Sequence, residues 1–142
     1  MRAYLFLLTL LFSVAHAQTD EDIVVVVNSE SELEQLDKRT LRNLYMGGIN
    51  RYRLTPLALS TGMTTRIIFN TKVLGLTESR IQSYWAQMRF SGGRARPPRE
   101  VTSLDDLLSL IESNPDMVGY VPASLELPAN VKVLYHSDSP TN

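Results

Sequence analysis

The sequence contains no cysteine among its 142 residues. A disulfide framework, thiolate catalysis and a cysteine-based metal site are therefore excluded. Histidine is scarce as well, since the chain has only His16, near its start, and His136, near its end. A single histidine with no nearby cysteine or carboxylate cluster is a poor basis for a metal site or a catalytic triad. We therefore predict that the protein is not an enzyme and that it has no cofactor.

The chain also lacks an excess of positive charge, internal repeats and low-complexity segments. Its formal net charge is −1. A general nucleic-acid binder would be markedly basic, so we expect no nucleic-acid partner. Long apolar runs are missing except at the N-terminus, where only Thr9 and Ser13 interrupt residues 3–14.

The N-terminal segment has the pattern of a secretory signal peptide. Arg2 supplies the positive start, residues 3–14 supply the apolar run, and Ala15-His16-Ala17 fits the small-x-small cleavage rule. The run is short for a membrane span, although an uncleaved anchor is the alternative. We predict removal of residues 1–17, a periplasmic location and no stable membrane span after cleavage. The mature chain would have a flexible start (18–22), one domain (23–136) and a tail (137–142).

The remaining pattern alternates strands with helices. The β-branched run Ile23 to Val27 does not alternate with polar residues, which indicates a strand covered on both faces, as in a parallel α/β sheet. Further strands are expected at 56–59, 117–121 and 131–135, and helices at about 38–46, 63–74, 77–90 and 103–113. Asp37 and Ser103 are expected to cap the first and last of these helices, Thr77 to start the third, and Gly47-Gly48 to end the first. A loop is expected at 91–100, which contains Gly92-Gly93 and Pro97-Pro98. This order predicts a three-layer α/β domain with a central, mostly parallel sheet and helices on both faces.

The polar turn before the second helix is the best candidate for a binding site. A helix start has unpaired backbone N–H groups and a partial positive charge, so it is suited to an oxyanion. In α/β sheets ligands lie at the carboxyl ends of strands, and the turn at Asn28-Ser29 meets that condition too. The alternative is a turn that only caps its helix. The candidate site comprises Ser60, Thr61, Gly62, Thr64, Thr65 and Arg66.

Other features have a structural interpretation as well as a functional one. Four arginines, at 89, 94, 96 and 99, could form a surface for an acidic partner or a second anion, or could be a solvated loop. Trp85 recurs at helical spacing with Ile81 and Met88, which favours a core position over a ligand platform. Helix capping explains the carboxylates of Glu78, Asp105 and Asp106. In the second helix the residues expected to face inward are Ile67, Ile68, Val73 and Leu74.

Three segments together resemble a known family. LRNLYMGGI (41–49), the polar turn with its helix (60–69) and NPDMVGYV (114–121) follow one another in an order similar to that of periplasmic phosphate-binding proteins. Those proteins are the substrate-binding subunits of phosphate ABC transporters. The resemblance, which covers about residues 23–135, implies the fold of one lobe and a phosphate loop at residues 61–65. The segment with Trp85, Phe90 and Pro97-Pro98 is closer still to short, secreted relatives.

The chain departs from that family at the phosphate loop. Gly62 and Thr65 keep the family's identity, whereas Thr61 stands where the family has an aspartate. Met63 and Thr64 replace a serine and a glycine. Arg66 is shared with the short relatives, and its planar fork could hold an oxyanion at two points. The resemblance therefore implies the place of the site, while the identity of the oxyanion stays open.

Two functions follow from these observations. The first is a periplasmic solute-binding lobe that captures a small oxyanion, with an ABC transporter permease as its partner by analogy and with a homodimer in place of a second lobe. The second is a scaffold or interaction module of a cell-envelope complex that has kept the fold and lost the ligand.

Overall fold

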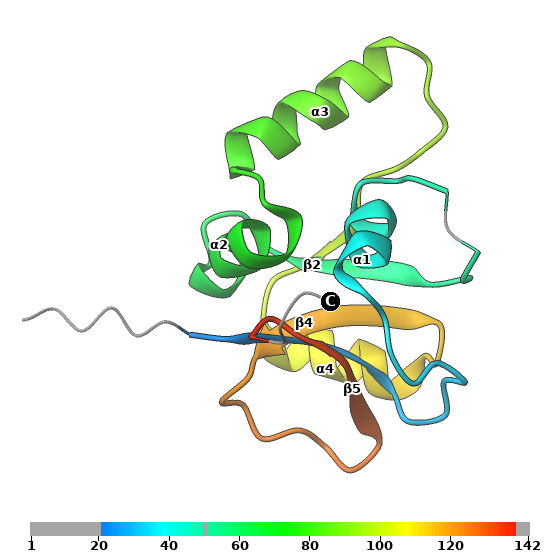
Figure 1. Cartoon of the computed structure of the whole chain (residues 1–142), viewed down its shortest axis with the longest axis vertical. Coiled ribbons are helices and arrows are strands. Elements are labelled where there is room, and N and C mark those ends of the chain that lie inside the picture. Colours follow the sequence, from blue (N-terminus) through cyan, green and yellow to red (C-terminus); the bar gives the residue numbers. More distant parts are fainter. Residues whose placement is uncertain (1–20, 50, 139–142) are drawn as a thin grey trace, which may run out of the picture.

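The computed structural model describes residues 21–49 and 51–138, and these form one five-stranded sheet with helices against it (Figure 1). The predicted signal peptide, residues 18–20 of the predicted N-terminal segment and residues 139–142 of the tail lie outside the described residues. The strands are β1 (Ile23–Asn28), β2 (Thr55–Leu59), β3 (Arg99–Val101), β4 (Met117–Pro122) and β5 (Val131–His136). Their order in the sheet is β3-β2-β4-β1-β5.

The sheet is mixed. β2 runs parallel to β3 and β4, while β1 runs antiparallel to β4 and β5. The prediction of an α/β lobe is confirmed, and four of the five strands run in one direction, with β1 alone opposed to them. Every residue of β1 is buried, as its apolar run predicts, because β1 lies between two other strands and has helices over its faces. Burial on both faces identifies a central strand, but it does not show whether the neighbouring strands are parallel or antiparallel.

The helices are α1 (Lys38–Tyr45), α2 (Thr64–Phe69), α3 (Glu78–Phe90) and α4 (Leu104–Ser113), and a π-helical segment, η1 (Asn70–Leu74), continues α2. Three helix starts are capped as the sequence predicts. The side chains of Asp37, Thr77 and Ser103 each accept a hydrogen bond from the N–H group three residues later. The end of α1 at Gly47 is also confirmed, since Gly47 has a left-handed φ of 72°.

Two neighbouring residues of β4 show how the layers are arranged. A Cβ on Gly119 would lie 2.9 Å from a methyl group of Leu107, so this face of the sheet lies against α4. The next side chain, Tyr120, points to the opposite face and stacks on Phe69 of α2, with ring centroids 3.8 Å apart. Tyr45 of α1 completes this cluster at 4.7 Å from Phe69. Helices therefore cover both faces of the sheet, as predicted.

Two details differ from the sequence prediction. Ile67 was expected to face inward but is 52% exposed, because the buried side of α2 and η1 follows residues 65–66, 69–70 and 73–74. The segment 91–100 is not all loop, since Arg99 and Glu100 belong to the edge strand β3. Trp85, at 4% exposed, is a core residue as expected. In the described part of the chain no helix is long and apolar enough to cross a membrane.

Candidate functional site

The polar turn lies at the carboxyl end of β2, where the sequence places it. Gly62 takes a left-handed φ of 91°, and Thr61 and Gly62 are exposed. Met63 then occupies the N-cap position of α2, and no side chain caps this helix start. The first amide groups of the helix, those of Thr64 and Thr65, have no partner within an α-helix. The exposed side chain of Thr64 lies beside them, while that of Thr65 is buried.

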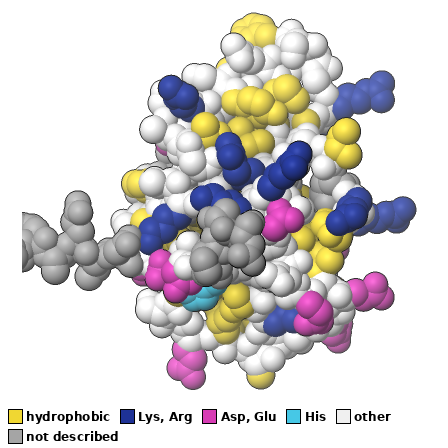
Figure 2. All heavy atoms as spheres, in the orientation of Figure 1, with side chains coloured by type: hydrophobic (Ala, Val, Ile, Leu, Met, Phe, Trp, Pro, Cys, Tyr) yellow, Lys and Arg dark blue, Asp and Glu magenta, His cyan; other side chains and the backbone are white. Residues whose placement is uncertain are grey.

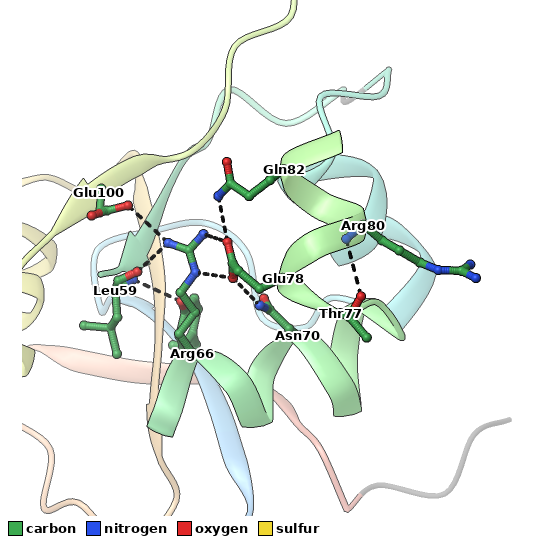
Figure 3. Close-up of polar contacts among 9 residues, drawn as sticks. Leu59, Arg66, Asn70, Thr77, Glu78, Arg80, Gln82 and Glu100 are labelled. Atoms are coloured by element: carbon green, nitrogen blue, oxygen red, sulfur yellow. Dashed lines mark hydrogen bonds and ion pairs between the residues drawn. The ribbon is translucent and has the colours of Figure 1, made fainter. Parts of the chain in front are cut away.

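The polar groups of Ser60 and Arg66 contact acceptors within the protein. The Ser60 hydroxyl lies 3.3 Å from the carbonyl oxygen of Val101 and donates to it. Arg66 is only 8% exposed, and its guanidinium group points to protein acceptors (Figure 3). The guanidinium group of Arg66 is thus engaged by the protein itself, and a role as a direct anion ligand stays a prediction.

Arg66 forms a two-point ion pair with Glu78. Its Nε donates to Oε2 of Glu78 at 2.9 Å, and its Nη2 donates to Oε1 at 2.6 Å. Its Nη1 donates to the carbonyl oxygen of Leu59 at 2.7 Å and lies 3.2 Å from Oε2 of Glu100. Burial alone would lower the pKa of Arg66, but the bonds to Glu78 outweigh it and raise that pKa. The guanidinium group is thus charged and committed to two carboxylates.

Glu78 has a part in this group that the sequence did not predict. It was interpreted as a helix-capping carboxylate, yet it also accepts bonds from Asn70 and Gln82, each at 2.8 Å (Figure 3). Burial raises the pKa of Glu78, and the bonds from Arg66, Gln82 and Asn70 more than reverse this, so the net pKa lies below its usual value of 4.5. A signal was available in the sequence. Arg66 and Asn70 fall on the same side of α2 as the core residue Phe69, so buried polar groups there needed a partner.

Arg66, Tyr45 and Tyr120 bridge a gap in the sheet, which is the region where β2 and β4 are no longer paired. The pairing of β2 with β4 stops at Pro56 and Val118. Beyond it, the Tyr45 hydroxyl lies between the strands, 2.9 Å from the carbonyl oxygen of Leu57 and 3.5 Å from that of Val118. The Leu59 N–H donates to the Tyr120 hydroxyl at 3.0 Å, and Arg66 takes the Leu59 carbonyl. Side chains therefore replace the missing ladder bonds.

Burial raises the pKa of both tyrosines at this gap. Both hydroxyls therefore stay protonated at neutral pH, which suits hydrogen bonding to backbone groups. Above the gap lies a cavity of about 270 Å³ beneath α3. Among the groups lining it are the rings of Phe69, Tyr120 and Trp85 and the polar side chains of Arg66, Asn70 and Gln82. Of the residues predicted at the turn only Arg66 reaches it, and Arg89 of the predicted arginine surface also lines it, so turn and cavity are separate places.

The other candidates are accounted for as follows. The second turn, at Asn28, is used by the fold, because its Nδ2 donates to the carbonyl oxygens of Ile111 and Glu112 at the end of α4. The four arginines at 89, 94, 96 and 99 are all exposed, on α3, on the loop after it and on β3. Across residues 21–49 and 51–138, no group of three or more His, Cys, Asp or Glu side chains could hold a metal ion.

Two solved structures of phosphate receptors are similar to this chain. An ABC-type phosphate transport receptor from Vibrio cholerae matches with a TM-score of 0.61 and 20% identity, over 80% of this chain and 45% of the receptor. A putative phosphate ABC transporter substrate-binding protein from Clostridium perfringens, solved with bound phosphate, matches with a TM-score of 0.61 and 13% identity, over 80% of this chain and 44% of that one. No protein-family model and no curated protein matches the sequence.

This likeness is one of fold. At 20% and 13% identity it carries no assignment of a ligand, and the chain spans less than half the length of either structure. The resemblance expected from the sequence motifs is confirmed at the level of the fold. The protein has the α/β fold of a single lobe of phosphate ABC transporter substrate-binding proteins.

Proposed function

We propose that the protein is a binding protein for a small oxyanion, which it holds at the turn 60–65. The observation that carries this proposal is the uncapped start of α2. Its first amide groups follow an exposed turn at the carboxyl end of β2, where α/β sheets place ligands. The two similar structures are described as a phosphate transport receptor and a putative phosphate ABC transporter substrate-binding protein, and the second was solved with bound phosphate. An anion would accept bonds from these amides and from the hydroxyls of Thr61 and Thr64.

Arg66 has a different part in this proposal from the one the sequence suggested. Its charge is offset by Glu78 and Glu100, so it would not attract an anion strongly. Instead it fixes the end of β2 through the Leu59 carbonyl, directly before the turn. We assign it as a positioning residue. The anion would then be held by backbone amides and neutral hydroxyls, which bind more weakly than a guanidinium fork.

A matched pair of variants tests the amide groups. Thr64→Pro removes one amide donor at the first helical position, where proline is tolerated. The preceding residue, Met63, already has the extended conformation that proline requires, with φ −67° and ψ 134°. Thr64→Ala keeps the amide and removes only the hydroxyl. Calorimetric titration with phosphate and with sulfate should show binding that Thr64→Pro weakens by about tenfold or more, an energy of about 1.4 kcal/mol. Thr64→Ala should weaken it less.

The same titration decides between the two functions. A wild-type protein that gives neither heat nor a rise in melting temperature with either anion would reject the binding proposal. The scaffold function would then stand, and it is favoured by one observation: Arg66 is already engaged by protein carboxylates. Equal affinities of Thr64→Pro and the wild type would reject the turn as the site.

We also propose export to the periplasm, with cleavage after Ala17, and a membrane transporter or envelope protein as the partner. The support is the signal-like pattern of residues 1–17 together with the fold of transport receptors. Mass analysis of the exported protein should find a new N-terminus at Gln18. An intact Met1 in the exported form would contradict the cleavage.

A further inference from the structure

The charges of this protein are separated along the chain. Residues 38–99 contain twelve Lys and Arg residues and one acid, Glu78. Residues 20–37 and 100–138 together contain fourteen acids and one base, Lys132. The formal net charge of −1 therefore conceals two regions of opposite sign. We call residues 38–99 the basic half and the other two segments the acidic half.

The two halves are also separate in space. The basic half contains α1, β2, α2, η1 and α3, whereas the acidic half contains β1, α4, β4 and β5. In Figure 1 these groups occupy opposite ends of the long axis, with α3 at the top. Figure 2 shows a similar division, with most Lys and Arg side chains over the upper and middle parts and most Asp and Glu side chains over the lower part. The molecule thus has a strong electrostatic axis.

Most of these charges do not hold the fold together. Arg66 and Lys72 pair with Glu100 and Asp22 across the boundary of the halves. Nine arginines of the basic half are exposed: Arg39, Arg42, Arg51, Arg53, Arg80, Arg89, Arg94, Arg96 and Arg99. Crowding like charges on one end costs stability through repulsion. A surface of the opposite sign would relieve that cost.

The basic half has the composition of an interface as well as its charge. Ten of its twelve cations are arginine. Arginine and aromatic residues are enriched in protein interfaces, and lysine is depleted. Phe90, at the end of α3, is 95% exposed, and Ile49 is fully exposed. A shallow groove formed by Tyr84, Met88 and neighbouring residues lies beside Phe90. Apolar contact area is therefore available among the charges.

We propose that the basic half of one copy docks on the acidic half of a second copy of this chain. The complementary surface is present in the same molecule, in the exposed carboxylates of Glu30, Glu32, Asp116 and Glu126. A nucleic acid or an anionic membrane fits less well, because it would repel the acidic half and the net charge is close to zero. Two copies in head-to-tail orientation gain attraction at the docked ends.

Salt dependence is the first test. Sedimentation velocity of the mature chain should show association in about 10 mM salt and monomers in about 1 M salt, since the screening length falls from about 30 Å to about 3 Å. We expect the dissociation constant to rise by at least tenfold between these conditions. A monomer at about 100 µM protein in the low-salt buffer would overturn the proposal.

Charge reversal on each half is the second test. The basic-half variant carries Arg89→Glu, Arg94→Glu and Arg96→Glu, and the acidic-half variant carries Glu30→Arg, Glu32→Arg and Glu126→Arg. All six positions are exposed, and circular dichroism would establish that both variants fold. Each variant alone should associate more weakly than the wild type in low salt, because the reversals lower the net charge of the basic half from +11 to +5 or that of the acidic half from −13 to −7. An equimolar mixture should form a one-to-one complex, since each variant keeps the half that the other needs.

The mixture tests whether the two halves bind each other, independently of how each variant behaves alone. If either variant still associates alone as the wild type does, the docking surface is wrong. If the mixture stays monomeric, the surfaces do not meet each other. A control with Arg89→Lys, Arg94→Lys and Arg96→Lys keeps the charge and should keep most of the association. Preferential binding of monomeric wild type to anionic vesicles would favour a membrane instead, and would also overturn the proposal.

Discussion

Arg66 and Glu78 are joined by two hydrogen bonds, of 2.9 and 2.6 Å, which connect α2 to the first turn of α3. The geometry is the planar fork-to-carboxylate contact that an oxyanion ligand would otherwise make with arginine. The protein therefore supplies its own anion to this arginine. Because the contact is intramolecular, its loss should appear first as a change in the free energy of unfolding and only then as a change in anion affinity.

Glu78→Gln should destabilise the protein by about 2–3 kcal/mol, because it leaves the buried guanidinium of Arg66 with a weaker acceptor. Glu78 is one quarter exposed and Glu100 still contacts Arg66, so the loss should fall below that of a fully buried pair. Urea unfolding gives the free-energy difference. Glu34→Gln is the matched control, since Glu34 pairs with Lys132 but is 84% exposed, and it should cost less than about 0.5 kcal/mol. Equal losses for the two variants would contradict the structural role of Glu78.

Acid should remove the contribution of Glu78 to stability. Its pKa in the folded protein lies below the usual value of 4.5, because the bonds from Arg66 outweigh the effect of burial. The stability that it contributes is therefore present above pH 4.5 and is lost as the pH falls through the lowered folded pKa. The difference in unfolding free energy between wild type and Glu78→Gln should be constant at neutral pH and should shrink below pH 4.5. A difference that stays constant into acid would contradict the lowered pKa.

The sequence predicted the elements of this fold well where one residue determines a local structure. Asp37, Thr77 and Ser103 cap the helices that they were expected to cap, and Gly47 ends α1. Strand direction was not predictable in this way, because the apolar run of β1 is equally suited to parallel and antiparallel neighbours. Direction depends on contacts with β4 and β5, about 90 to 110 residues further along the chain.

The turn was predicted at the right place in the chain, while anion binding there stays a prediction. Thr61 and Gly62 are exposed and precede α2, as the residue types suggested, but the lack of a side-chain cap on this helix was not predicted. The role of Arg66 could not be read from its neighbours, because its partners Glu78 and Glu100 lie 12 and 34 residues away. Local patterns predict where a backbone amide is free to bind. They do not predict which carboxylate from a distant part of the chain pairs with an arginine.

Removal of the Tyr120 hydroxyl should cost more than removal of the Tyr45 hydroxyl. Tyr120→Phe leaves the buried N–H of Leu59 without its acceptor, a loss of about 1–3 kcal/mol. Tyr45→Phe removes a donor to the Leu57 carbonyl, and an under-satisfied carbonyl is tolerated better, so about 1 kcal/mol is expected. Unfolding free energies from urea titration compare the two variants. The reverse order would show that the Leu59 N–H has found another acceptor.

The contact between Gly47 and the loop after α3 gives the final prediction. Gly47 and Gly75 both have left-handed φ angles, of 72° and 65°, so alanine strains the backbone at either position. At Gly75 an added Cβ meets nothing within 4 Å. At Gly47 it would lie 2.8 Å from Cβ of Ala95 and 2.9 Å from the ring of Trp85. Gly47→Ala should therefore be less stable than Gly75→Ala by about 1–3 kcal/mol, the usual cost of overpacking.

The same pair of variants tests where the arginine-bearing loop lies. Ala95 stands between Arg94 and Arg96, so the close approach at Gly47 holds these arginines beside α1. In Gly47→Ala the loop should be displaced, and limited proteolysis after Arg94 or Arg96 should become faster than in Gly75→Ala. Equal stability and equal cleavage rates in the two variants would mean that the loop does not rest on Gly47. The end of α1 would then not fix the position of Arg94 and Arg96 in the basic half.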